Sequence, residues 1–360
     1  MLRSIFFSVV ILVCAFQLSS CKGPEPVDPS GESFDKEAML QNIGENIISA
    51  SYDAVSQKLT EVEGKIGEFE LEQTEAKLNA LRTSVMEAHL LWQACSPFEF
   101  GPAAEQNLRL SVNTFPLDTA RVNQKISQAD YSLDGTQDAA AKGFPAMEFL
   151  LFSEEDSIVL QQLQNENHWS YFKANFDMVQ TKIASVNEAW KGTYVSDFAG
   201  NTGSSAGSSI SLLVNQLNYD FELLKNAKIG IPLGKKTLGV TQTDKVESPF
   251  ALQSIALVKA NLAGIKAAFI GNENQGFDDY LDALGAKYNQ NNLSDEIIAG
   301  FEVSELALNA ISADLANAIK SEPSKVEAAY TALQNLVVLL KVDMPSQLGV
   351  QITYQDNDGD

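Results

Sequence analysis

One carboxylate in this 360-residue chain stands where burial would give it unusual chemistry. Glu148 lies in the run Gly143–Phe152, in which nearly every other side chain is apolar. A helix that is apolar on nearly every face is buried, and a buried carboxylate needs a partner or takes a raised pKa. Glu148 is therefore a candidate ligand-binding or catalytic group. The alternative is that it hydrogen-bonds to a neighbouring helix and fixes the packing.

This run resembles the signature of a known family. Gly143 and Glu148 match the glycine-x-histidine-x-x-glutamate motif of the imelysin family, bacterial envelope proteins that are named for an insulin-cleaving peptidase and include iron-regulated proteins. The histidine position is occupied by Pro145. Proline can neither bind a metal nor carry a proton near neutral pH, so this departure weighs against the family's proposed chemistry at its own motif.

Two earlier segments resemble the family in the expected order. Trp92 precedes an aromatic-x-aromatic-glycine-proline turn, and Ser96 stands where we expect the family's glutamate. Phe115–Asp118 fits an aromatic-proline-leucine-aspartate motif, in which Asp118 is also a candidate helix cap. The resemblance thus adds Trp92, Ser96 and Asp118 to the candidate site.

Two later segments are also similar to the family. Lys225–Gly234 carries a lysine-asparagine, glycine-isoleucine-proline and glycine pattern, although basic residues followed by glycine and proline also end helices for ordinary reasons. Glu247 and Ser248 resemble the glutamate-serine start of a family helix. Because Pro249 follows, we expect that helix to begin with Ser248 as its N-cap.

The resemblance leaves two functions open. The first is an imelysin-like protein, non-catalytic or catalytically altered and linked to iron uptake, that binds a ligand or partner in a cleft between two helical domains. Its site residues are Gly143, Pro145, Glu148, Ser96, Trp92 and Asp118. The second is a metallopeptidase of the imelysin type, with Glu148 as the catalytic base. A divalent metal or iron is the cofactor implied, but neither His89 nor His168 lies in a metal-ligand spacing.

Helices must position these residues. Apolar residues recur at steps of three and four along most of the chain, which predicts amphipathic helices that pack into bundles. A glycine- and serine-rich segment at 200–209 divides them. We therefore predict an all-α protein with two helical-bundle domains, in a duplicated four-helix-bundle-like arrangement. The N-terminal bundle spans residues 34–199 and carries the motif, the C-terminal bundle spans 210–345, and 346–360 is an extended tail.

The amino terminus predicts a bacterial lipoprotein. Arg3 is followed by the apolar run Ile5–Phe16 and by Leu18–Cys21, which reads as a lipobox. Cleavage would remove residues 1–20 and leave acylated Cys21 and a tether at 21–33, anchoring the protein in the cell envelope on the periplasmic side or at the cell surface. The alternative is an ordinary secretory signal. Only Cys95 would then remain as a free thiol, and we expect it to be buried rather than nucleophilic.

The charge balance limits the partners. The chain carries 47 Asp and Glu against 25 Lys and Arg, a net charge of −22. This charge excludes nucleic acid as a good electrostatic partner. It suits cations and cationic partners better, although an acidic surface commonly serves solubility alone. The partners that remain are the membrane, through the lipid on Cys21, and an unknown small ligand, metal or envelope protein.

Overall fold

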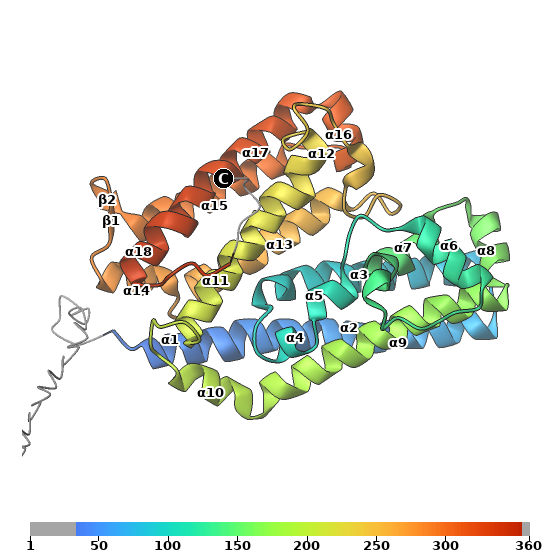
Figure 1. Ribbon diagram of the computed structural model, residues 1–360, viewed down its shortest axis with the longest axis horizontal. Helices are drawn as coiled ribbons and strands as arrows, with labels where there is room; N and C mark the ends of the chain where they lie inside the picture. Colours follow the sequence, from blue (N-terminus) through green and yellow to red (C-terminus); the bar gives the residue numbers. More distant parts are fainter. Residues whose placement is uncertain (1–33, 355–360) are drawn as a thin grey trace, which may run out of the picture.

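The computed structural model describes residues 34–354, and these are almost entirely helical (Figure 1). Within them the only strands are β1 (Lys287–Tyr288) and β2 (Asn291–Asn292), which pair antiparallel. The all-α prediction is therefore confirmed. The predicted signal segment, the lipidation site at Cys21, the tether and the last residues of the tail lie outside the described residues.

The N-terminal group of helices is built on three long ones, α2, α3 and α9, whose apolar faces meet in a common core. Its elements are α1 (Lys36–Asn42), η1 (Ile43–Ser49), α2 (Ala50–Leu71), α3 (Glu75–Cys95), η2 (Ser96–Phe98), α4 (Pro102–Glu105), α5 (Leu108–Val112), α6 (Thr119–Ser127), η3 (Thr136–Ala141), α7 (Phe144–Phe152), α8 (Asp156–Leu163), α9 (Glu166–Ala189), η4 (Trp190–Tyr194) and α10 (Val195–Gly200). In Figure 1 these blue-to-green helices form one elongated layer.

The C-terminal group lies across that layer in yellow to red (Figure 1). Its elements are α11 (Ser209–Glu222), η5 (Leu223–Gly230), α12 (Ile231–Leu233), η6 (Thr243–Lys245), α13 (Ser254–Ile270), α14 (Phe277–Ala283), α15 (Leu293–Asn309), α16 (Leu315–Ser321), α17 (Pro323–Val338), η7 (Leu339–Asp343) and α18 (Met344–Leu348). Helices α15 and α17 pack against each other, and α13 and α14 pack on α15.

Helix α13 joins the two groups because it packs directly on α3. A Cβ atom added at Gly264 would lie 2.8 Å from the Cα of Ala94, so the two backbones approach more closely than any larger residue allows at this point. The α3–α13 contact brings the end of α3, which leads into Ser96, next to the C-terminal group. This contact sets the relative position of the two groups of helices, so that side chains from both can come into contact.

One predicted helix start is wrong. The helix expected from Ser248 begins at Ser254 as α13, and Ser248 itself has a left-handed φ of 55°. The reason is that buried carboxylates hold the segment 246–253 as a loop, as described below. At α15 the N-cap is Asn292, and the hydroxyl of Ser294 in the first turn donates to Asp282.

The last described residues lie along α11. Asn215 donates from Nδ2 to the carbonyl of Gln351 at 3.0 Å, and its Oδ1 accepts from the backbone N–H of Thr353 at 2.7 Å. The ring of Tyr354 meets that of Tyr219 edge to face. Over residues 34–354, no helix combines the length and the apolar character that a membrane crossing requires.

Candidate functional site

The start of α7 is fixed by a position that only glycine can occupy. Gly143 has a φ of 77°, and a Cβ atom there would lie 2.2 Å from the carbonyl oxygen of Val112. Its N–H donates to Oδ1 of Asn175 at 2.8 Å. Pro145 lies in the first helical turn, where a missing N–H costs nothing. The motif glycine therefore seats α7 against the end of α5, immediately before Asn113.

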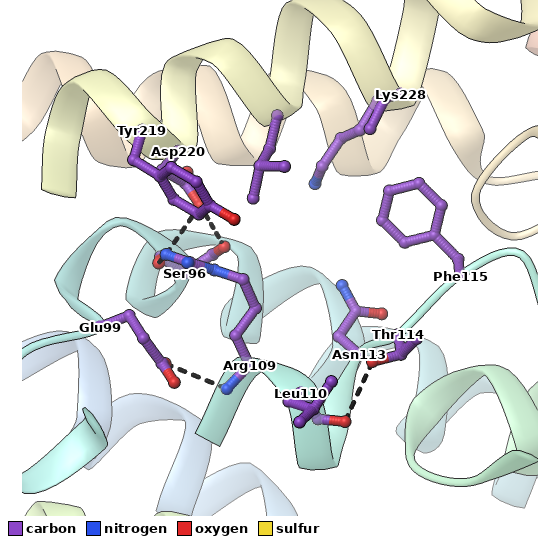
Figure 2. A pocket seen from close by; sticks show the side chains of 12 residues that line it. Ser96, Glu99, Arg109, Leu110, Asn113, Thr114, Phe115, Tyr219, Asp220 and Lys228 are labelled. Carbon is purple, nitrogen blue, oxygen red and sulfur yellow. Dashed lines mark hydrogen bonds and ion pairs between the residues drawn. The ribbon is translucent and has the colours of Figure 1, made fainter. Parts of the chain in front are cut away.

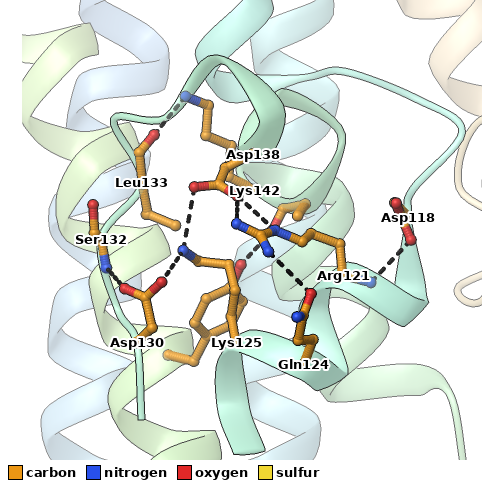
Figure 3. Close-up of polar contacts among 11 residues, drawn as sticks. Asp118, Arg121, Gln124, Lys125, Asp130, Ser132, Leu133, Asp138 and Lys142 are labelled. Carbon is orange, nitrogen blue, oxygen red and sulfur yellow. Dashed lines mark hydrogen bonds and ion pairs between the residues drawn. The ribbon is translucent and has the colours of Figure 1, made fainter. Parts of the chain in front are cut away.

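The segment that leads to Gly143 is held by a buried ionic network, shown in Figure 3. One carboxylate oxygen of Asp138 accepts a hydrogen bond from Arg121 Nε at 2.8 Å, and the other accepts one from Lys125 Nζ at 3.2 Å. Lys125 also donates to Asp130 at 2.8 Å, and Lys142 donates to the carbonyl of Leu133 at 2.7 Å. We call these five charged residues the scaffold network. It fixes the loop on which α7 begins.

Glu148 ties α7 to the loop before α13. Its side chain is 1% exposed, and Oε1 accepts the backbone N–H groups of Phe250 and Ala251, each at 2.9 Å. The other oxygen, Oε2, has no hydrogen-bond partner. Burial raises the pKa of the Glu148 carboxyl, against the opposing effect of these N–H groups and of His89. The motif glutamate thus joins the two groups of helices.

A second buried carboxylate, Glu247, lies in the same loop. Its Oε1 accepts Nδ2 of Asn113 at 2.8 Å and Nε2 of Gln93 at 3.0 Å, and its Oε2 lies 3.0 Å from Nζ of Lys228. Burial alone would raise the pKa of Glu247, but the Lys228 ammonium, the nearby His89 ring and the hydrogen bond from Asn113 outweigh burial and hold this pKa well below its usual range. Glu247 is therefore ionised beside a buried cation.

His89 stands between the motif and this carboxylate. Its ring stacks on that of Phe144 with centroids 4.7 Å apart, and Nε2 lies 3.0 Å from Oδ1 of Asn113 and 3.7 Å from Oε1 of Glu247. Its Nδ1 has no partner. An imidazole from α3 thus lies beside the motif helix, although the motif position itself holds proline. We call His89, Gln93, Asn113, Glu148, Lys228 and Glu247 the interface network.

The interface network does not fit a bare metal ion. Among residues 34–354, no three histidine, cysteine, aspartate or glutamate side chains come close enough together to hold one. The ammonium of Lys228 already neutralises Glu247, and it would repel a second cation at that carboxylate. The chemistry of the donor set therefore favours hydrogen bonding over metal coordination.

A pocket of about 300 Å³ opens next to the interface network (Figure 2). Asn113 and Lys228 belong to both. The pocket lies between η2 and α5 on one side and α11 and η5 on the other, so both groups of helices line it. Its lining residues are Ser96, Glu99, Arg109, Leu110, Asn113, Thr114, Phe115, Tyr219, Asp220, Leu223, Ala227 and Lys228.

One end of the pocket is built on a buried aspartate. Asp220 accepts the hydroxyl of Ser96 at 2.6 Å and lies 3.3 Å from Nη2 of Arg109. The Arg109 guanidinium also lies over the ring of Tyr219, 5.3 Å from its centroid, and Nε has no partner. Burial raises the pKa of the neighbouring Glu99 carboxyl, whose Oε2 accepts the backbone N–H of Arg109.

The predicted site residues fall in different places. Gly143, Pro145 and Glu148 lie on or beside α7 and do not line the pocket, whereas Ser96 does. Trp92 is fully buried in the core and does not line the pocket. Asp118 caps α6 by accepting the N–H of Arg121 at 2.9 Å, next to the scaffold network. Cys95 is a buried free thiol whose pKa burial raises, as expected of a core residue.

Sequence reasoning missed most of the interface network. Lys228 and Glu247 lie within segments that resembled the family, but each had an ordinary explanation in helix termination or capping. His89 looked like an isolated histidine, and Arg109 carried no motif. The available signal was that each of these polar residues interrupts or adjoins an apolar face that the fold buries.

Comparison with known proteins agrees with this architecture. A model of the imelysin family matches residues 48–342. Iron-regulated protein A of Synechococcus elongatus is 23% identical over 247 residues, which cover 66% of this chain and 65% of that relative. An imelysin-like protein from Psychrobacter arcticum has a TM-score of 0.71 at 18% identity, covering 89% of this chain and 97% of that structure. A protein from Parabacteroides distasonis, described as an iron-regulated protein A precursor, has a TM-score of 0.75 at 18% identity, covering 90% and 98%.

Proposed function

The chain belongs to the imelysin family, and from that premise we propose that it is a ligand-binding protein of the bacterial cell envelope whose site is the pocket beside Lys228. One observation carries the proposal. Lys228 lines the pocket and also pairs with Glu247, which accepts hydrogen bonds from Gln93 of α3 and from Asn113. A ligand that contacts Lys228 or Asn113 therefore touches the network that joins the two groups of helices.

The role of Glu148 favours binding over catalysis. Its Oε1 is engaged by two backbone N–H groups of the neighbouring loop, and no metal-ligating set surrounds it among the described residues. Pro145 removes the histidine that the family motif would offer. In this proposal Glu148 holds the loop that carries Glu247 and does not act on a substrate.

The envelope location rests on the sequence. Leu18–Cys21 supports acylation of Cys21, and the name of the Synechococcus relative supports a link to iron. In cells fed a labelled fatty acid, we expect label on the chain and none on Cys21→Ser. Label retained by the Cys21→Ser variant would remove the lipid anchor from the proposal.

Binding is tested with the full-length chain in a thermal-shift screen of single compounds: amino acids, sugars, organic acids, inorganic anions and divalent ions. We expect at least one class to raise the melting temperature. Leu110→Trp should abolish that shift, because Leu110 lines the pocket and takes no part in the interface network. Leu306→Trp, the same change at an exposed position on α15, should leave it intact.

Two results would overturn the proposal. One is a screen in which no compound shifts the wild-type chain, or in which every shift survives Leu110→Trp. The other is cleavage of unfolded casein by the purified chain, lost in Glu148→Gln. That result would establish the metallopeptidase reading, in which Glu148 acts as the base.

A further inference from the structure

Two cations face the pocket from opposite groups of helices. Figure 2 shows the side chain of Arg109 extending from α5 at one end of the pocket and that of Lys228 extending from η5 at the other end. Each is backed by its own buried carboxylate, Asp220 for Arg109 and Glu247 for Lys228. These carboxylates fix the direction of the two side chains.

Both cations retain unused donors. Arg109 donates from Nη2 to the carbonyl of Ser96 at 2.5 Å, but its buried Nε has no partner. Lys228 is 4% exposed, and its ammonium has three N–H groups, of which one faces Glu247 at 3.0 Å and one goes to Gln93 at 2.5 Å. Its third N–H has no partner among the side chains of the described residues.

The acceptors at the pocket are largely occupied. Oδ1 of Asp220 accepts a hydrogen bond from Ser96 and pairs with Arg109. Its Oδ2 accepts a hydrogen bond from Nδ2 of Asn261 at 2.5 Å. Oε2 of Glu99 is engaged by the backbone of Arg109, and burial favours the neutral form of that carboxyl. The unused capacity of the pocket is therefore mainly that of donors, which recognise an anion.

The remaining walls are apolar. The other lining residues include Leu110, Phe115, Leu223 and Ala227. A volume of about 300 Å³ lies at the small end of ligand pockets, so the ligand has few heavy atoms. A short carbon skeleton with an acidic group at each end would present apolar atoms to these walls and a carboxylate to each cation.

On this basis we infer that the pocket binds a small di- or tricarboxylate, with one carboxylate at Arg109 and another at Lys228. The inference rests on the proposed function, since it names the ligand class of the same pocket. The shared chemistry is the carboxylate, which can arrive as the free acid or as its iron chelate. A chelate would bring iron to the pocket without any metal ligand from the protein.

The test is calorimetry of the full-length chain with succinate, citrate and ferric citrate as probes. Succinamide, the uncharged counterpart of succinate, and inorganic phosphate are the comparison probes. We expect binding of at least one carboxylate, no binding of succinamide, and at least a tenfold weaker affinity in Arg109→Gln and Lys228→Gln. Lys235→Gln, at a surface ion pair, should bind as wild type does. A preference for ferric citrate over citrate would identify the chelate as the source of the carboxylate.

Leu110→Trp separates failure of this inference from failure of the proposed function, and it leaves both charged networks intact. Loss of carboxylate binding in Leu110→Trp, with binding kept in Leu306→Trp, supports the inference. If succinamide or phosphate binds as well as the carboxylates do, or if only another class of compound binds and Leu110→Trp blocks it, the carboxylate inference fails while the pocket remains a ligand site. If no probe of any class binds, both proposals fail.

Discussion

The scaffold network and the interface network are both buried and charged, but they use their hydrogen-bonding capacity differently. In the scaffold network, none of the buried side-chain atoms lacks a partner (Figure 3). In the interface network, three atoms make no hydrogen bond: His89 Nδ1, Glu148 Oε2 and Glu247 Oε2, the last of which faces only the Lys228 ammonium at 3.0 Å. Ser248 Oγ, in the loop that the network holds, makes none either. Ser248 also has a left-handed φ, which disfavours any residue but glycine, asparagine or aspartate.

The difference separates two uses of buried charge. A buried network whose atoms are all paired fixes one conformation, whereas unpaired buried atoms cost free energy and persist where they serve a purpose. The scaffold network holds the loop before α7. The interface network joins the two groups of helices and adjoins the pocket, so it is the one placed to respond to a ligand.

The largest expected loss of stability comes from a substitution in the scaffold network. Asp138→Ala removes a buried partner of Lys125 and Arg121, and breaking such a pair costs about 3–5 kcal/mol of the free energy of unfolding. Ligand affinity of the fraction that still folds should be unchanged. Chemical denaturation and calorimetry measure the two quantities.

Asp130→Ala is the matched control, because Asp130 pairs with the same lysine but is 44% exposed. We expect it to cost far less than Asp138→Ala, because solvent screens the exposed pair. Equal costs for the two variants would show that burial does not distinguish these carboxylates. Altered ligand affinity in either variant would remove the distinction between the two networks.

The next effect is at Glu148. Glu148→Ala leaves the N–H groups of Phe250 and Ala251 without their acceptor, which should cost about 2–4 kcal/mol. It should also weaken binding, since the loop that carries Glu247 loses its tether. Glu148→Gln keeps one acceptor oxygen and should cost less. Full stability of Glu148→Ala would show that this carboxylate does not hold the loop.

Smaller effects should appear in the pH dependence, with opposite signs for the two carboxylates. The raised pKa of Glu148 means that the folded chain binds its proton more tightly, so this group lowers stability as pH rises above the ordinary glutamate value of about 4.3. The lowered pKa of Glu247 means that its contribution is lost as pH falls below that value.

Denaturation of wild type, Glu148→Gln and Glu247→Gln between pH 2 and pH 8 separates these contributions, because the two windows lie on opposite sides of the ordinary glutamate value. Relative to wild type, Glu148→Gln should gain stability as pH rises. The deficit of Glu247→Gln should shrink as pH falls. Shifts in the same direction for both variants would contradict the assigned environments.

The helices were predictable because their apolar spacing is local. The burial of Glu148 followed from the apolar run around it, and the need for glycine at position 143 followed from the motif. The partners of Glu148 were not predictable, because Phe250 and Ala251 meet it through backbone N–H groups about a hundred positions away, in a segment that was predicted to be helical. Where long-range hydrogen bonds replaced local preference, the sequence pattern misled.

The smallest effect concerns Asp118, which the motif placed in the site and the structure places at the N-cap of α6. Loss of a capping carboxylate typically costs about 1 kcal/mol, so Asp118→Ala should destabilise the chain by about that amount and leave ligand affinity unchanged. Asp314→Ala removes the corresponding cap of α16, remote from both networks, and should cost about the same. A much larger cost at Asp118 would make it part of the scaffold network, since its helix carries Arg121 and Lys125. Reduced affinity in Asp118→Ala alone would instead return it to the ligand site, and would show that the loop before α7 transmits strain to the pocket.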